Sequence, residues 1–267
     1  MASYSRRRFM KLGANAAFGG LLVYTARGLV SQPSSPPAAE AGSGSAYDLY
    51  RPEEHDWAFI IDTSKCIGCG RCARACKLEN DVPWEPQCNR TWVERYSFTA
   101  DGEVSVDSPD GGINGFAVEE LPEEVQGKEI TKSFFVPKLC NQCEKPPCVQ
   151  VCPVGATYKT GDGVVLVNRD RCIGCRYCIQ ACPYGGRYLL PKEHVVDKCT
   201  WCYHRITRGQ LPACVEACPV GARAFGDLRD PESDVSRVLA EERISVLKPE
   251  MGTKPNVSYL DLDGAVR

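Results

Sequence analysis

Sixteen of the seventeen cysteines in this 267-residue chain fall into four sets of four, and this grouping constrains the fold more than any other feature. The first and third sets have the spacing C-x2-C-x2-C-x3-C, the second has C-x2-C-x4-C-x3-C and the fourth has C-x2-C-x11-C-x3-C. In chain order, set one is Cys66, Cys69, Cys72 and Cys76, set two is Cys140, Cys143, Cys148 and Cys152, set three is Cys172, Cys175, Cys178 and Cys182, and set four is Cys199, Cys202, Cys214 and Cys218. Cys88 stands alone.

The C-x2-C-x2-C-x3-C spacing is that of the bacterial ferredoxin run that holds a [4Fe–4S] cluster. Three thiolates two residues apart can wrap one corner of a cubane from a single tight loop, whereas the fourth ligates the neighbouring cluster of a two-cluster unit. Proline follows the fourth cysteine in three sets, as Pro153, Pro183 and Pro219. We expect it at the first position of a helix that the fourth cysteine opens. Gly68 and Gly174 should let backbone N–H groups approach the sulfurs. Four such sets predict four [4Fe–4S] clusters.

Disulfides and zinc are the two alternative uses of these cysteines. A disulfide framework would suit an exported chain, but the two-residue spacing recurs too regularly and the chain is long enough to build a core without cross-links. Structural zinc is held by pairs of C-x2-C, so set four alone is ambiguous. Sets one and three do not have zinc-like spacing.

A short apolar run typical of a strand precedes each set, at residues 57–61, 134–136, 164–167 and 195–196. The sequence C-P-V-G-A occurs at 152–156 and again at 218–222. Repeated strand–loop–helix units predict an α+β fold of two ferredoxin-like two-cluster units in a pseudo-symmetric arrangement, with a β-rich insertion and a C-terminal extension. The apolar residues expected to form core around the clusters are Ile67, Val149, Val151, Ile173, Ile179 and Val215.

The chain is predicted to divide at the boundaries of the sets. The predicted parts are a signal and linker (1–46), motif one (47–76), an insertion with a β-hairpin (77–139), a unit from motifs two and three (140–198), motif four, which completes the unit of motif one (199–226), and a C-terminal docking tail (227–267). The hairpin is expected at 91–98 and 104–106, with Gly111 and Gly112 in a surface loop. A capped helix is expected over 230–242 and a final strand over 257–262.

The N-terminus is typical of an export signal. Arg6, Arg7 and Arg8 are followed by Phe9 and Lys11, an apolar stretch at 12–30 and a Pro-rich spacer. This order predicts a twin-arginine signal with an A-x-A-like cleavage site at residues 39–41. Residues 44–46 are an alternative cleavage site. An anchoring or amphipathic helix with chance arginines is the alternative. The signal predicts a periplasmic protein that crosses the membrane folded, with its clusters already inserted. No later apolar run is long enough to span a bilayer.

These motifs, across roughly residues 55–262, resemble the four-cluster iron–sulfur subunit of the complex iron–sulfur molybdoenzyme family. That family includes the electron-transfer subunits of dimethyl sulfoxide, thiosulfate, polysulfide and tetrathionate reductases and of formate dehydrogenases. The resemblance implies that sets one and four share one two-cluster unit and that sets two and three share the other. The implied ligands are Cys66, Cys69, Cys72 and Cys218 for cluster 1, Cys199, Cys202, Cys214 and Cys76 for cluster 2, Cys140, Cys143, Cys148 and Cys182 for cluster 3, and Cys172, Cys175, Cys178 and Cys152 for cluster 4.

The resemblance also implies a non-catalytic subunit. It would relay electrons between a quinone-reactive, polysulfide-reductase-type (NrfD-like) integral membrane subunit and a periplasmic molybdopterin catalytic subunit. The alternative is the same relay in a hydrogenase or multihaem cytochrome complex. A self-contained redox enzyme would need an open coordination site, which sixteen cysteines for four clusters do not leave. A structural zinc scaffold is a further alternative. It would be a colourless protein that contains zinc and has no reducible chromophore. The formal net charge of −2 argues against a nucleic-acid partner, and no dinucleotide or P-loop fingerprint occurs.

Few other residues carry a functional signal. His55 and His194 are expected on the surface, whereas His204 either tunes the neighbouring cluster or is solvated or packed. Trp201 lies inside the loop of set four, where its ring would exclude water. Cys88 is expected to be a buried, inert thiol because an exposed thiol would be an oxidation liability in the periplasm.

Overall fold

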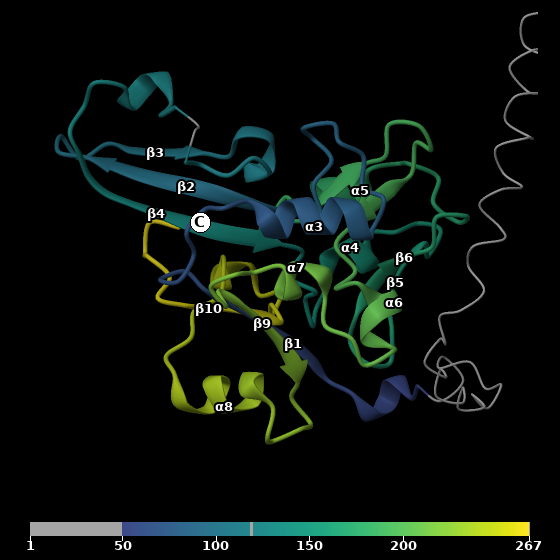
Figure 1. The fold of residues 1–267 in the computed structure, drawn as a ribbon. Coiled ribbons are helices and arrows are strands. Elements are labelled where there is room, and N and C mark those ends of the chain that lie inside the picture. Colours follow the sequence, from purple (N-terminus) through teal and green to yellow (C-terminus); the bar gives the residue numbers. More distant parts are fainter. Residues whose placement is uncertain (1–49, 118–119, 267) are drawn as a thin grey trace, which may run out of the picture. The chain divides into compact units, whose positions relative to one another are not determined.

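The computed structural model describes residues 50–117 and 120–266, which are coloured by sequence in Figure 1. All of them belong to one unit, residues 44–267. The predicted signal and linker at 1–46 lie outside the described residues, so the export route stays a prediction. The proposed division of the chain into six parts likewise stays a prediction.

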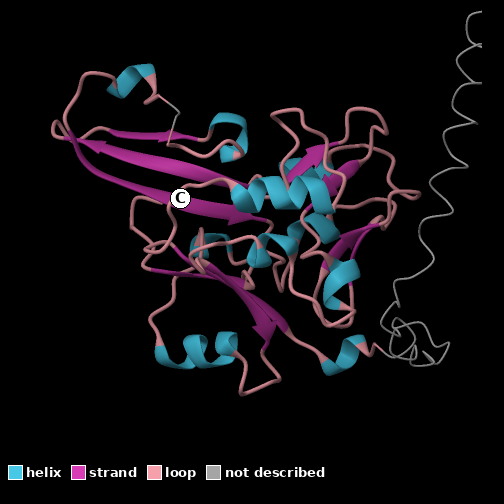
Figure 2. Cartoon of the chain, in the orientation of Figure 1, coloured by secondary structure: helices cyan, strands magenta, loops and turns pink. Residues whose placement is uncertain are grey.

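Short strands and short helices alternate along the described residues (Figure 2). The strands are β1 (Trp57–Asp62), β2 (Thr91–Thr99), β3 (Val104–Asp107), β4 (Ile130–Leu139), β5 (Thr157–Lys159), β6 (Val165–Val167), β7 (Arg187–Leu189), β8 (Val196–Lys198), β9 (Arg223–Asp227) and β10 (Val257–Leu260). The α-helices are α3 (Arg71–Glu79), α4 (Pro147–Gln150), α5 (Tyr177–Gln180), α6 (Tyr203–Ile206), α7 (Ala213–Glu216) and α8 (Asp234–Glu241). Single turns of 3-10 helix are Pro52–Glu54, Pro109–Gly112, Glu123–Val125 and Pro249–Met251. This content confirms the α+β class.

Strand β1 is the centre of a three-stranded sheet of order β10-β1-β9. It runs parallel to β10 and antiparallel to β9, so that Phe59 lies opposite both Val257 and Phe225. Ala58 and Ile60 pack against Val235 of α8, whereas Phe59 and its same-face neighbours belong to the main core. Both faces are therefore covered, which explains why β1 reads as a continuous apolar run. The predicted final strand is confirmed as β10, which is an edge strand of this sheet.

The insertion forms the longest strands of the chain. Strand β2 pairs with β3 and β4 in a sheet of order β3-β2-β4, and the predicted hairpin is confirmed. The placing of Gly111 and Gly112 in a surface loop is wrong, because both are buried. A Cβ atom added to Gly112 would lie 3.0 Å from the Phe116 ring and 3.1 Å from the Val93 carbonyl. This turn folds back onto β2 and needs glycine to approach it.

Helix α8 is the predicted C-terminal helix. It begins at Asp234 rather than at residue 230, because Ser233 is the residue that caps it. The Ser233 hydroxyl accepts a hydrogen bond from the Ser236 backbone N–H at 3.1 Å, which satisfies one of the helix's unpaired donors. Residues 231–232 form the turn before the cap.

The predicted position of the helices relative to the fourth cysteines is wrong. Helices α4, α5 and α7 end two residues before the fourth cysteine of sets two, three and four. The cause is the following proline, which disfavours helical backbone in the residue before it. Set one has Lys77 in place of proline, and there α3 continues through Cys76 to Glu79. Instead of a helix, a strand begins five residues after each of the other fourth cysteines, as β5, β7 and β9.

Part of the predicted core is also wrong. Ile67 and Ile173 are 56% and 64% exposed, and Val151 is 37% exposed. Neighbouring residues of an extended loop point in opposite directions, so Ile67 and Ile173, which follow Cys66 and Cys172, face solvent. Val149, Ile179 and Val215 are half-buried and pack against the core as expected. The main core instead joins Phe59, Trp201, Phe225 and Tyr259 to the buried cysteines.

Gly174 generates a test of how closely set three is packed. Its φ is +67°, and an added Cβ would lie 2.2 Å from the His194 carbonyl oxygen. Gly209 has a similar φ of +71° but nothing within 4 Å of an added Cβ, so G209A measures the backbone cost alone, about 1–2 kcal/mol. We expect G174A to lower the free energy of unfolding by about 1–3 kcal/mol more than G209A. Equal urea midpoints for the two variants would contradict this close contact.

Candidate iron–sulfur sites

Two cavities are each lined by four cysteines drawn from two sets. Cavity A is lined by Cys66, Cys69 and Cys72 of set one together with Cys218 of set four. Cavity B is lined by three cysteines of set two and one of set three, namely Cys140, Cys143, Cys148 and Cys182. Each cavity therefore brings four thiols from two sets to one place.

Seven of the eight other cysteines of the sets fall into two further groups of neighbouring thiols. Burial raises the pKa of Cys76 well above its usual range, and the nearby Cys199, Cys214 and Cys202 raise it further. Burial raises the pKa of Cys178 as well, with smaller contributions from Cys172 and Cys152. Cys175 is exposed. Across residues 50–117 and 120–266, no three His, Cys, Asp or Glu side chains gather closely enough for a single metal ion.

Helix packing brings the sets together in pairs. Helix α3 of set one contacts α7 of set four, and α4 of set two contacts α5 of set three (Figure 1). The two pairs also meet. Cys199 of set four is close enough to Cys140 of set two for the Cys140 sulfur to raise the pKa of Cys199. The thiols thus form one continuous series through the core.

Burial controls the protonation of these thiols. It raises the pKa of Cys199 and of Cys143 to about 12 and that of Cys214 to about 11. Thiols with such pKa values stay protonated at neutral pH, and a metal must displace the protons to bind. Backbone N–H groups donate hydrogen bonds to the sulfur of four of the cysteines: Thr157 N lies 3.4 Å from Cys152 Sγ, Val196 N 3.4 Å from Cys172 Sγ, Trp201 N 3.4 Å from Cys199 Sγ, and Ala222 N 3.3 Å from Cys218 Sγ.

The glycines of the tight loops act as the sequence predicts in set one. Gly68 has φ +64°, and its backbone amide hydrogen-bonds to Cys66. Burial still raises the pKa of Cys66 to about 11, although this hydrogen bond opposes the rise. An added Cβ on Gly68 would lie 2.6 Å from the Phe135 ring of β4, so the residue also lets the loop pack against the long sheet.

Two buried arginines test whether an anionic group fits the cavities. Arg223 lines cavity A and Arg187 lines cavity B. Arg187 Nε and Nη2 and Arg223 Nη1 are buried and have no hydrogen-bond partner within the described part of the chain. An unpaired buried charge is costly, whereas thiolate-ligated iron–sulfur clusters are anionic and accept hydrogen bonds at sulfur. The donors that these cavities present therefore fit [4Fe–4S] clusters.

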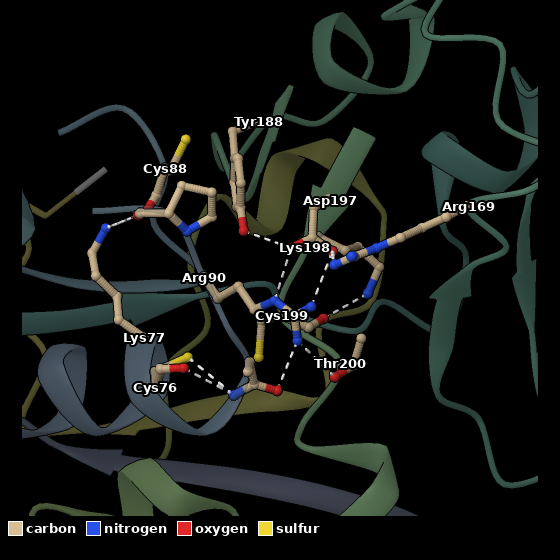
Figure 3. A network of polar contacts seen from close by, with 12 residues as sticks. Cys76, Lys77, Cys88, Arg90, Arg169, Tyr188, Asp197, Lys198, Cys199 and Thr200 are labelled. Carbon is tan, nitrogen blue, oxygen red and sulfur yellow. Dashed lines mark hydrogen bonds and ion pairs between the residues drawn. The ribbon is translucent and has the colours of Figure 1, made fainter. Parts of the chain in front are cut away.

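A buried polar network supports the cysteines of sets one and four (Figure 3). Arg90 forms a bidentate pair with Asp197, with Nε–Oδ2 and Nη2–Oδ1 distances of 3.0 and 3.1 Å. Arg90 Nη1 donates to Asn80 Oδ1 at 2.8 Å, which turns the Asn80 amide N–H groups toward sulfur. Asn80 Nδ2 lies 3.7 Å from Cys76 Sγ and 3.5 Å from Cys202 Sγ.

Sequence reasoning missed this network. Only the spacing of Asn80 from Cys76 was available as a signal, since residues four apart share a helix face. Arg90 and Asp197 are 107 residues apart, and no local pattern links them.

The three histidines differ in their surroundings. His55 is partly exposed rather than freely solvated: its ring stacks between Tyr50 and Trp57, and Nδ1 lies 2.6 Å from Asp227 Oδ2. His194 is exposed, as predicted. His204 Nε2 lies 2.7 Å from Glu79 Oε1, which agrees with a packed side chain.

Cys88 and Trp201 are buried, as predicted. Cys88 belongs to a small apolar cluster away from the cavities, and its carbonyl accepts a hydrogen bond from Lys77 Nζ at 2.6 Å. Burial raises the pKa of the Cys88 thiol, which makes it a poor nucleophile at neutral pH. Trp201 is 1% exposed and packs against Phe59 and Phe225. Its ring excludes water from the loop of set four.

Comparison with known proteins gives consistent matches. Residues 65–156 and residues 131–228 each match a family described as a 4Fe-4S dicluster domain. The B subunit of tetrathionate reductase from Salmonella typhimurium is 42% identical over 224 residues, covering 81% of this chain and 79% of that protein. The B subunit of sulfite dehydrogenase from Allochromatium vinosum is 42% identical over 214 residues (76% and 82% of the two proteins). The corresponding polypeptide of polysulfide reductase from Wolinella succinogenes is 38% identical over 202 residues (75% and 92%).

Every helix in the described residues is too short or too polar to cross a membrane.

The Arg90–Asp197 pair generates a stability prediction. We expect D197N to lower the free energy of unfolding by about 3–5 kcal/mol, because it leaves Arg90 buried without its counter-charge. Burial would raise the pKa of Asp197, but Arg90 outweighs it and lowers that pKa. The pair's contribution is therefore complete above the usual carboxyl pKa and is lost as pH falls through the lowered value. The free energy of unfolding of D197N should therefore fall less steeply in acid than that of the unmodified chain.

Urea unfolding across a range of pH measures both effects. D263N is the control, because the Lys132–Asp263 pair is far more exposed than the Arg90–Asp197 pair and should contribute less than about 1 kcal/mol. A D197N variant as stable as D263N would contradict the prediction.

Proposed function

The chain belongs to the iron–sulfur subunit family of the complex iron–sulfur molybdoenzymes, and on that premise we propose that it relays electrons between a membrane subunit and a periplasmic catalytic subunit. It is a non-catalytic subunit, like the relatives it matches, and its two dicluster domains hold four [4Fe–4S] clusters. The observation that carries the proposal is the continuous series of cysteine sets through one core.

We propose that each cluster takes three ligands from one set and exchanges its fourth with the paired set. Cluster 1 is held by Cys66, Cys69, Cys72 and Cys218, and cluster 3 by Cys140, Cys143, Cys148 and Cys182; these are the cysteines that line cavities A and B. Cluster 2 is assigned to Cys199, Cys202, Cys214 and Cys76, and cluster 4 to Cys172, Cys175, Cys178 and Cys152. The effects of the neighbouring thiols on the pKa of Cys76 and on that of Cys178 support the last two assignments, apart from that of Cys175.

Bound clusters supply one-electron chemistry, and the residues of this chain control where it takes place. The aromatic side chains of the core exclude water, and backbone N–H groups stabilise the thiolates. We propose that the two units are related by pseudo-symmetry. The pairs α3–α7 and α4–α5, each followed by a strand that begins with arginine, support this relation.

The proposed partners follow from family membership. Relatives that are themselves named as subunits of reductases imply a catalytic subunit, which we propose contains molybdopterin. The second proposed partner is a polysulfide-reductase-type (NrfD-like) integral membrane subunit that exchanges electrons with quinone. The twin-arginine signal at 1–46 would place the assembly in the periplasm, peripheral to the membrane.

Iron counting in double variants tests the exchanged ligands. C66A and C218A should each lose one cluster, about four irons. If Cys66 and Cys218 serve the same cluster, the double variant C66A/C218A should lose no more than either single variant. C202A/C218A should lose about eight irons, because those residues are assigned to different clusters. C88A is the matched control and should keep all of its iron. The reverse pattern in the two double variants would show that each set serves its own cluster.

Purification of the native complex tests the partners. The complex would be isolated anaerobically from detergent-solubilised membranes through a tag on this chain, and its subunits and metals identified. We expect molybdenum, a large pterin-binding subunit and a polytopic membrane subunit. Nickel or haem in their place would move the chain to a hydrogenase or cytochrome complex. A chain that keeps its iron but brings no partner would contradict a fixed subunit role.

A further inference from the structure

An arginine occupies the same position after two of the cysteine sets. Set three continues as C-P-Y-G-G-R to Arg187, and set four continues as C-P-V-G-A-R to Arg223. Both arginines are the first residue of the strand that follows the set, β7 and β9. After set two the same position is held by Thr157, the first residue of β5. The position is thus a repeated structural feature of the fold.

Each of these arginines faces both sets of one pair. Arg223 lines cavity A with the cysteines assigned to cluster 1, and it also lies beside Cys214, which is assigned to cluster 2. Arg187 lines cavity B with the cysteines assigned to cluster 3, and it also lies beside Cys178, which is assigned to cluster 4. Each guanidinium group therefore stands at the junction between two proposed clusters.

Neither arginine has the counter-charge that other buried arginines of the chain have. Arg90 and Arg95 are paired with Asp197 and Asp107. Arg187 and Arg223 are only 5% and 3% exposed, and within residues 50–117 and 120–266 neither forms an ion pair with a carboxylate.

Threonine hydroxyls are the anchors that the structure shows for them. Arg187 Nη1 donates to Thr157 Oγ1 at 3.3 Å, and Arg223 Nη2 donates to Thr91 Oγ1 at 2.8 Å. These bonds hold one nitrogen of each guanidinium. Within the described ranges, Arg187 Nε and Nη2 and Arg223 Nη1 remain buried without a protein acceptor. A hydroxyl orients the side chain but does not neutralise it.

We propose that Arg187 and Arg223 are bridging arginines, each of which lies between the two clusters of one unit and stabilises the reduced state of both. Reduction adds one electron, and so one negative charge, to an already anionic centre. A fixed guanidinium in a low-dielectric core favours that added charge and supplies hydrogen bonds to sulfur, a known means of tuning cluster potentials. The bridging arginines thereby keep both centres of a unit reducible and limit the repulsion between them. This inference rests on the ligand sets proposed above.

Redox titration of the full chain, followed by electron paramagnetic resonance, tests the proposal without any catalytic assay. We expect R187Q to lower the reduction potentials of two of the four centres and R223Q to lower those of the other two. The expected shift corresponds to at least a tenfold change in the reduction equilibrium, about 59 mV for one electron. R95Q is the matched control, because it removes a buried arginine that lines neither cavity, and it should leave all four potentials unchanged.

The lysine variants separate charge from shape. R187K and R223K keep the positive charge but lose the planar set of donors, so they should keep their iron and give smaller shifts than the glutamine variants. Full iron content with unshifted potentials in R187Q and R223Q would overturn the proposal. If the glutamine variants lose iron, equal loss from the lysine variants would also overturn it, because it would show a requirement for shape rather than charge. Failure of the proposed relay function would be detected by other measurements, namely the subunit composition of the native complex and the iron counts of the cysteine variants. Failure of the bridging-arginine proposal would appear only in the arginine variants.

Discussion

The packing of thiols and unpaired guanidinium groups into one core is the constraint on which the rest of the structure depends. Burial holds thiols such as Cys199 and Cys143 in their protonated form, while Arg187 and Arg223 are buried with N–H donors that lack an acceptor among the described residues. Protonated thiols are neutral and can remain buried, whereas the buried arginines need an anion. Iron that displaces the thiol protons forms anionic clusters, which supply that anion. Cluster binding and folding are therefore coupled in this chain.

The spacing of the cysteines was enough to predict the fold class and the cofactor, because ligand geometry leaves few arrangements for C-x2-C-x2-C-x3-C. The hairpin of the insertion and strand β10 were also readable from local patterns. The helices were displaced from their predicted positions by Pro153, Pro183 and Pro219, whose effect on the preceding residue outweighs their preference for a helix start. The exposure of Ile67 and Ile173 was missed because apolar character alone does not reveal which way a loop residue points.

The interactions that tune the site were beyond sequence reasoning for a different reason. The Arg90–Asp197 pair joins residues 107 positions apart, and Arg223 is anchored by Thr91, 132 positions away. Such pairs exist only once β7, β8 and β9 are in place around the cysteine loops. The two kinds of buried arginine then differ in role. Arg90 is neutralised by a carboxylate and orients Asn80 toward sulfur, whereas Arg187 and Arg223 keep their charge for the anionic centres beside them.

Quantitative analysis of iron, acid-labile sulfide and zinc, with Mössbauer spectra of the anaerobically purified full chain, tests the central claim most directly. Four cubanes in one core predict about sixteen irons and about sixteen sulfides per chain, negligible zinc, and spectra of [4Fe–4S] centres alone. A colourless chain containing zinc, or one whose cysteines are joined in disulfides, would contradict the account. So would a folded, stable chain without metal, because the unpaired arginines would then need no anionic partner.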